Sequence, residues 1–160
     1  MSNLKREIKQ TKPFTSLEQE TLLNLQRTAS EVSSPYLKYL KQNGLSHSLY
    51  NILRILRGQE GKGLSCSGIG GRMVTRDSDI TRLIDRLLKL ELVDRVRSED
   101  DRRVVLTSIN SKGLKLLKEL DKPMNDMNKE SLAHLTIEEK KQLNRLLDKA
   151  RNTKKKGLLK

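Results

Sequence analysis

Two groups of side chains in this sequence have the chemistry to bind a polyanion. The first group shares one face of a predicted helix and consists of Ser78, Thr81, Arg82 and Arg86. The second group lies at the tip of a predicted hairpin and consists of Asp101, Arg102 and Arg103. Guanidinium groups donate paired hydrogen bonds to phosphate or to the edge of guanine, and short hydroxyls reach either group. Alternatively, the two helical arginines are simply solvated, or they pair with Asp79 and Asp85 at helical spacing.

The other reactive residue types form no recognisable catalytic or metal-binding pattern. No Ser/His/Asp or Cys/His arrangement is apparent, so we do not expect an enzyme. His47 and His134 are isolated, and the glycine-rich stretches lack the spacing of a phosphate-binding loop, so no metal or cofactor is predicted. Cys66 is either a redox-sensitive thiol or a small buried residue, and its apolar neighbours favour burial.

The overall charge favours a nucleic-acid partner. The chain has 160 residues, and 33 Lys and Arg against 20 Asp and Glu give a net charge of +13. Such an excess attracts nucleic acid or an anionic membrane surface. The polar N-terminus contains no signal core and no apolar stretch is long enough for a membrane span, so we expect a cytoplasmic protein without a membrane partner.

The clearest amphipathic helix is predicted over residues 75–89, with Thr75 as its N-cap. Its apolar positions fall on one broad face: Ile80, Leu83, Ile84, Leu87 and Leu88. A helix anchored by one face can place the opposite face in the major groove of DNA. A helix capped by Ser46 is predicted upstream of it, and a short, glycine-weakened helix is predicted between residues 67 and 73.

After Leu92 the hydrophobic pattern changes from helical to alternating. Residues 93–98 and 104–109 are predicted strands of a hairpin with an extended, charged tip. Leu64 is expected in another short strand. The order helix, short helix, amphipathic helix and hairpin predicts a winged helix-turn-helix, which is mainly α with a small β-hairpin wing.

Long helices are predicted on both sides of this unit. In the segment 16–44, Pro35 should bend or break the helix. After residue 110, Leu114 and later apolar residues should form one buried face, with a kink at Pro123. A capping box at Thr136 begins a last helix.

The central sequence resembles that of the MarR-type transcription regulators. Four pieces carry the resemblance: Asp79–Leu87 (DITRLIDRL), Leu92–Arg95 (LVDR), Asp101–Thr107 (DRRVVLT) and Gly113. The resemblance covers about residues 16–150, strongest from Leu49 to Leu120. The chain departs from the family at Gly68 and Gly71 in the short helix, where an acidic residue is usual.

This resemblance implies a domain organisation. A single domain is implied over 16–150, with a DNA-binding lobe at about 45–110 and dimerisation helices at 16–44 and 111–150. A polar lead-in over 1–15 precedes it, and a basic tail over 151–160 follows it.

The resemblance also implies a homodimeric regulator, in most members a repressor, which binds a pseudo-palindromic double-stranded operator and is released by a small-molecule effector or by oxidation. Arg103 of the wing would enter the minor groove, with Asp101 orienting it. Two other functions stay open. One is weakly specific or architectural nucleic-acid binding through the basic charge, and the other is a partner-binding module that has lost DNA specificity.

Overall fold

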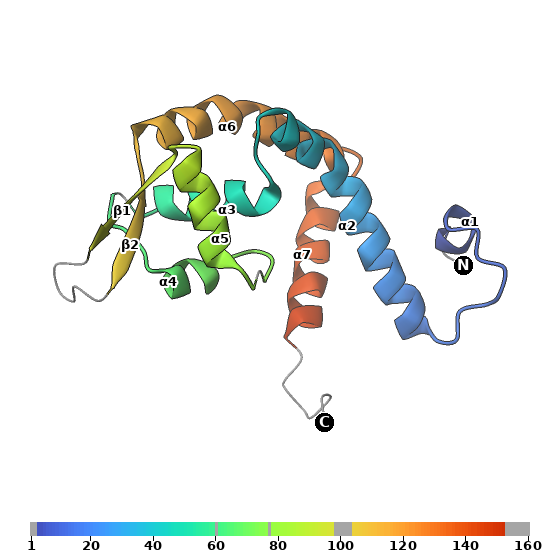
Figure 1. The fold of residues 1–160 in the computed structure, drawn as a ribbon. Coiled ribbons are helices and arrows are strands. Elements are labelled where there is room, and N and C mark those ends of the chain that lie inside the picture. The colour runs from blue at the N-terminus through green and yellow to red at the C-terminus, as the bar shows by residue number, and fades with distance from the viewer. Residues whose placement is uncertain (1–2, 60, 77, 98–103, 153–160) are drawn as a thin grey trace, which may run out of the picture.

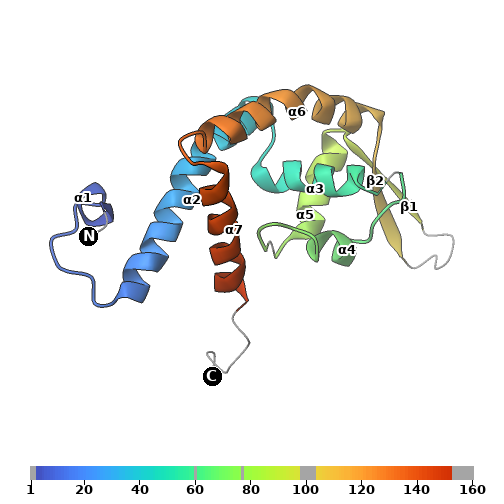
Figure 2. The same ribbon diagram turned by 180° about the vertical axis from the view of Figure 1, so that it is seen from behind.

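The computed structural model describes residues 3–59, 61–76, 78–97 and 104–152 (Figures 1 and 2). Over these ranges the chain forms helices and one hairpin, in the order α1 (Leu4–Glu7), α2 (Leu17–Gln42), α3 (His47–Arg57), α4 (Cys66–Gly70), α5 (Ile80–Lys89), β1 (Val93–Arg97), β2 (Val105–Ile109), α6 (Ser111–Ser131) and α7 (Ile137–Arg151). The mainly α fold with a hairpin wing is therefore confirmed.

A compact lobe forms around α3, which lies at its centre. The side chain of Ser46 accepts a hydrogen bond from the backbone N–H of Leu49 and so caps α3, as predicted. The buried leucines and isoleucine of α3 share one hydrophobic cluster with Ile84 and Leu87 of α5 and with Leu117 of α6. Each such side chain contributes about 1.5–3 kcal/mol when fully buried, so this cluster holds α5 firmly against the lobe.

The wing is an antiparallel hairpin whose register runs from Val93 opposite Ile109 to Arg97 opposite Val105. Leu64 adds a short bridge to Thr107, with backbone hydrogen bonds of 2.9 and 2.8 Å in the two directions. The strand expected at Leu64 is thus present as a single bridge, and it attaches the segment before α4 to the wing.

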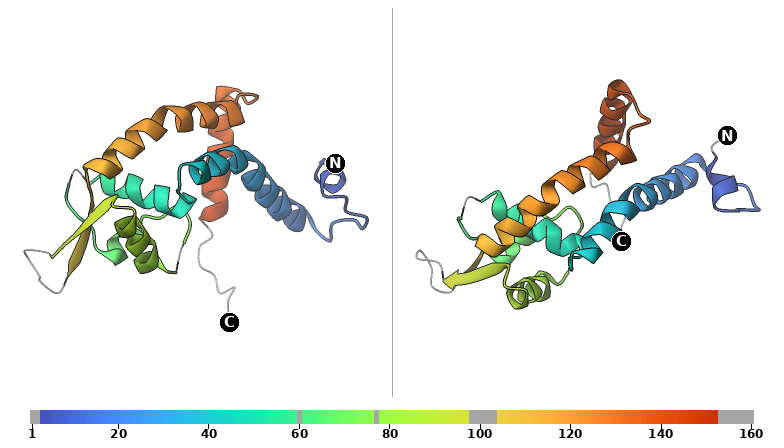
Figure 3. Two further views of the ribbon diagram at one scale, coloured as in Figure 1. Left: turned by 45° about the horizontal axis from the view of Figure 1, so that its top comes forward. Right: turned by 90° about the horizontal axis from the view of Figure 1, so that it is seen from above.

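The long helices α2 and α6 pack beside the lobe and extend beyond it (Figure 3). Pro35 does not break α2, which is continuous but changes direction along its length (Figure 1). A proline removes only one helical hydrogen bond, and the C-terminal part of α2 is held on the core by the buried Leu40.

The buried stripe of α6 begins one position earlier than predicted and ends at Met124, short of the predicted Met127 and Leu132, which are only half-buried. Gly113, Leu117, Leu120 and Met124 are buried, whereas Leu114 is 43% exposed. The prediction for Leu114 was wrong because a glycine occupies the position that lies closest to the hairpin, which an apolar pattern does not reveal.

The N-terminal segment is more than a polar lead-in. It contains α1, in which Leu4 is only 2% exposed, and Glu7 lies 4.0 Å from Arg27 of α2. No helix in the described ranges is long and apolar enough to cross a lipid bilayer.

Candidate nucleic-acid interface

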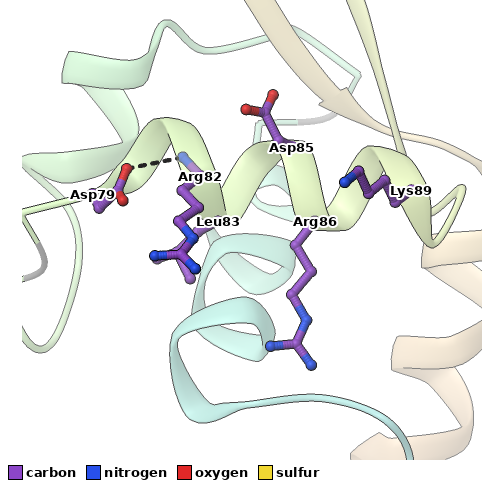
Figure 4. A pocket seen from close by; sticks show the side chains of 6 residues that line it. All are labelled: Asp79, Arg82, Leu83, Asp85, Arg86 and Lys89. Atoms are coloured by element: carbon purple, nitrogen blue, oxygen red, sulfur yellow. Dashed lines mark hydrogen bonds between the residues drawn. The ribbon is translucent and has the colours of Figure 1, made fainter.

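The amphipathic helix α5 begins later than its sequence pattern predicts. Asp79, and not Thr75, is the N-cap, and its Oδ1 accepts a hydrogen bond of 3.1 Å from the backbone N–H of Arg82 (Figure 4). A carboxylate at this position satisfies a free N–H and interacts favourably with the helix dipole. The preceding turn is held by Asn51 of α3, whose Oδ1 accepts a hydrogen bond of 2.8 Å from the N–H of Val74.

The solvent-facing side of α5 carries three exposed cations: Arg82, Arg86 and Lys89. Together with Asp79, Leu83 and Asp85 they line a shallow hollow of about 560 Å³ (Figure 4). Arg82 and Arg86 extend from the same side of the helix, away from Asp85 (Figure 4). We call this side the α5 basic face, defined by Arg82, Arg86 and Lys89.

Asp85 does not neutralise the α5 basic face. Its carboxylate pairs with Arg95 of β1 at 2.8 Å, and this ion pair joins α5 to the wing. Among the described residues neither Arg82 nor Arg86 forms an ion pair, so the expected alternative in which they pair with Asp85 is wrong. Two guanidinium groups are therefore available to an external anion.

The predicted contact residues on and before α5 lie close together. Thr81 is exposed on α5 beside Arg82, and Ser78 is exposed immediately before the N-cap. The predicted wing-tip residues Asp101, Arg102 and Arg103 lie outside the described residues.

One basic residue near the site was not selected from the sequence. Arg97 ends β1 and is exposed, and it lies on the same side of the strand as Arg95, because alternate residues of a strand share a face. The sequence does show arginines at alternate positions of this strand, which could have indicated Arg97. The same alternation is equally typical of a hairpin face that is only solvated.

A second hollow, of about 410 Å³, lies where α2, α3 and α5 meet. It is lined by residues that include Leu37, Lys41, His47 and Arg86, so Arg86 borders both hollows. The imidazole of His47 lies 5.7 Å from the ring of Tyr36, and burial lowers the pKa of His47 below its ordinary value. His47 is consequently neutral at neutral pH.

Cys66 begins α4, where it is half-buried and packs against the hydrophobic core. This position agrees with a small core residue. The short helix itself forms despite its glycines, because the side chain of Ser65 caps it by accepting a hydrogen bond from the N–H of Gly68.

The helix-turn-helix of α4 and α5, flanked by a hairpin and exposing a basic face, defines a winged helix-turn-helix DNA-binding protein. Residues 45–105 match the model of the MarR family. The transcriptional regulator PapX of Escherichia coli is 32% identical to this chain over an alignment that covers 71% of this chain and 69% of PapX. A MarR transcription factor from Planctomyces limnophilus, of known structure, is 39% identical over 85% of this chain and 98% of its own, with a TM-score of 0.65.

The chain belongs to the MarR family of DNA-binding transcription regulators, which are not enzymes. The fold is also shared with MepR of Staphylococcus aureus in a structure of its DNA complex. That likeness has a TM-score of 0.74 and 18% identity, and it covers 86% of this chain and 99% of MepR.

Proposed function

We propose that this protein is a sequence-specific repressor that binds a pseudo-palindromic operator as a homodimer. The observation that carries the proposal is the α5 basic face, on which two arginines without ion pairs to described residues project from a helix anchored by its other side. A helix of this kind fits the major groove, where arginine recognises guanine through O6 and N7.

The contact residues divide into two roles. Arg82 lies near the N-terminal end of α5, the part of a recognition helix that reads base edges, so we assign it to base recognition. Ser78, Thr81 and Arg86 are assigned to phosphates, which fix the register of the protein on the duplex. The wing residues Arg102 and Arg103, with Asp101, are assigned to the adjacent minor groove on the family resemblance alone.

Apolar side chains on the terminal helices support the homodimer. Leu17, Leu22 and Leu25 of α2 and Leu143 and Leu146 of α7 are all exposed in the single chain. Exposed apolar residues on several neighbouring helices are typical of a surface that a second subunit covers. Two copies related by twofold symmetry would place their α5 helices in successive major grooves, about 34 Å apart.

A small-molecule effector is proposed for the hollow between α2, α3 and α5. Its walls combine the apolar Leu37 with the cations Lys41 and Arg86. A ligand with an apolar body and an anionic group would complement these walls. Because Arg86 also belongs to the α5 basic face, such a ligand would compete with DNA for that side chain.

The proposal is tested by competition binding of wild type and Arg82→Ala to a library of half-site variants. Loss of a base contact should reduce discrimination at one base pair of each half-site by about 1–3 kcal/mol and leave the other positions unchanged. An unchanged preference profile would remove Arg82 from base recognition. Binding without any preference in the wild type would favour the weakly specific alternative.

A further inference from the structure

Each long helix carries a proline near the point at which it leaves the hydrophobic core. In α6 the last buried residue is Met124, one position after Pro123. In α2 the buried residue is Leu40, five positions after Pro35. A proline removes one hydrogen bond of the helical ladder and weakens the helix locally against bending. The two long helices therefore bend most easily near Pro35 and Pro123, where they leave the lobe.

One ion pair bridges the lobe and α6 beside Pro123. Nη1 of Arg57 donates to both carboxylate oxygens of Asp121, at 3.1 and 2.8 Å. Arg57 is the last residue of α3, at the centre of the lobe, and Asp121 lies two positions before Pro123. The side chains are 33% and 41% exposed, so water screens this pair less than it screens a fully solvated one.

The ion pair supplements an apolar contact between α3 and α6 that does not by itself fix the angle between these two helices. Leu117 and Leu120 of α6 are buried in the same cluster as the leucines of α3. Apolar contacts are non-directional, so they hold the two helices together while tolerating small rotations. The two hydrogen bonds from Nη1 of Arg57 are charge-assisted and depend on distance and angle, so they favour one orientation of α3 relative to α6.

We propose that the Arg57–Asp121 pair determines which spacing between operator half-sites the protein accepts. The proposal rests on the proposed function, because spacing has meaning only when two copies bind one operator. A lobe held at a fixed angle to α6 places its α5 at a fixed distance from the α5 of the second copy. Without the pair the apolar residues still hold α6 on the lobe, but α3 and α6 can rotate slightly against each other, and neighbouring spacings become less costly.

The test is a spacing library bound by full-length wild type and Asp121→Asn. Each duplex carries the half-site that the wild type selects, repeated in inverted orientation, with spacers that differ by one base pair. In Asp121→Asn, the enrichment of the best spacing over its neighbours should fall about fivefold, while the base preference within each half-site stays the same. The double variant Arg57→Asp with Asp121→Arg should restore part of the wild-type ratio.

Glu91→Gln is the matched control. It removes a carboxylate that also pairs with a residue of α6, since Glu91 lies 2.7 Å from Lys112, but this pair lies on the wing side of the lobe. Its spacing ratio should equal that of the wild type. If Asp121→Asn fails to fold, Arg57→Gln makes the same test, because it removes the charge of the other partner.

A wild-type spacing ratio in a folded Asp121→Asn or Arg57→Gln protein would overturn this inference and leave the proposed function intact. A wild type that selects no paired half-sites would instead overturn the proposed function.

Discussion

Replacing Arg86 by alanine should reduce the salt dependence of operator binding by a calculable amount. Arg86 is exposed on α5 and forms no ion pair with a described residue, so a phosphate contact would displace counterions from DNA without first breaking a bond within the protein. Each phosphate contact contributes about 0.9 to the slope of log K against log salt concentration. A homodimer has two copies of Arg86, so the slope should decrease by about 1.8, which is 2 × 0.9.

The assay is fluorescence anisotropy with a labelled operator between about 50 and 200 mM salt. When the salt concentration rises fourfold, a slope difference of about 1.8 reduces the ratio of wild-type to Arg86→Ala affinity about twelvefold. Lys118→Ala is the control, because it removes the same charge from an exposed position on α6. An unchanged slope in Arg86→Ala, or an equal decrease in Lys118→Ala, would refute a phosphate contact at Arg86.

Three further predictions concern stability and are measured by thermal unfolding at one fixed protein concentration. In Gly113→Ala the new Cβ would meet the carbonyl oxygen of Leu92 and lie 2.7 Å from Cγ1 of Ile109, so a loss of about 3 kcal/mol is expected; a near-wild-type melting temperature would contradict the packing described here. Glu91 has a φ of 57°, so Glu91→Gly should relieve backbone strain and raise the melting temperature by about 2 °C, and a clear decrease would argue against that strain. Because burial lowers the pKa of His47 below 6.5, the unfolded chain takes up a proton before the folded one does as the pH falls through 6.5. As the pH falls from 6.5 to the lower pKa that His47 has in the folded protein, the wild type should therefore lose more stability than His47→Gln. Parallel stability profiles of the two proteins over this range would contradict the reasoning.

The local elements of the lobe could be predicted from sequence because their signals are local. The caps at Ser46 and Thr136, the apolar face of α5 and the alternation of β1 each lie within a few residues of the structure they specify. The start of α5 was misplaced because Thr75 and Asp79 are both good N-caps, and the segment before Asp79 is held by a contact with a different helix, the hydrogen bond from Val74 to Asn51.

The long-range contacts had no comparable signal. Arg57 and Asp121 are separated by 64 positions, and nothing in their neighbourhoods indicates a partner. The pairing of Asp85 with Arg95 was also missed, because helical spacing pointed to the arginines of α5 instead. The exposure of Leu143 and Leu146 has a related cause, since a pattern of apolar residues predicts that a face is covered and does not indicate whether the same chain covers it.

The most direct test of the central claim is selection of the full-length protein on random duplex DNA at about 150 mM salt, where nonspecific electrostatic binding is already weak. Sequence-specific recognition by two α5 helices predicts a pseudo-palindrome whose half-site centres are about one helical turn apart. Recovery of no motif, with binding that disappears as the salt concentration rises, would contradict the account.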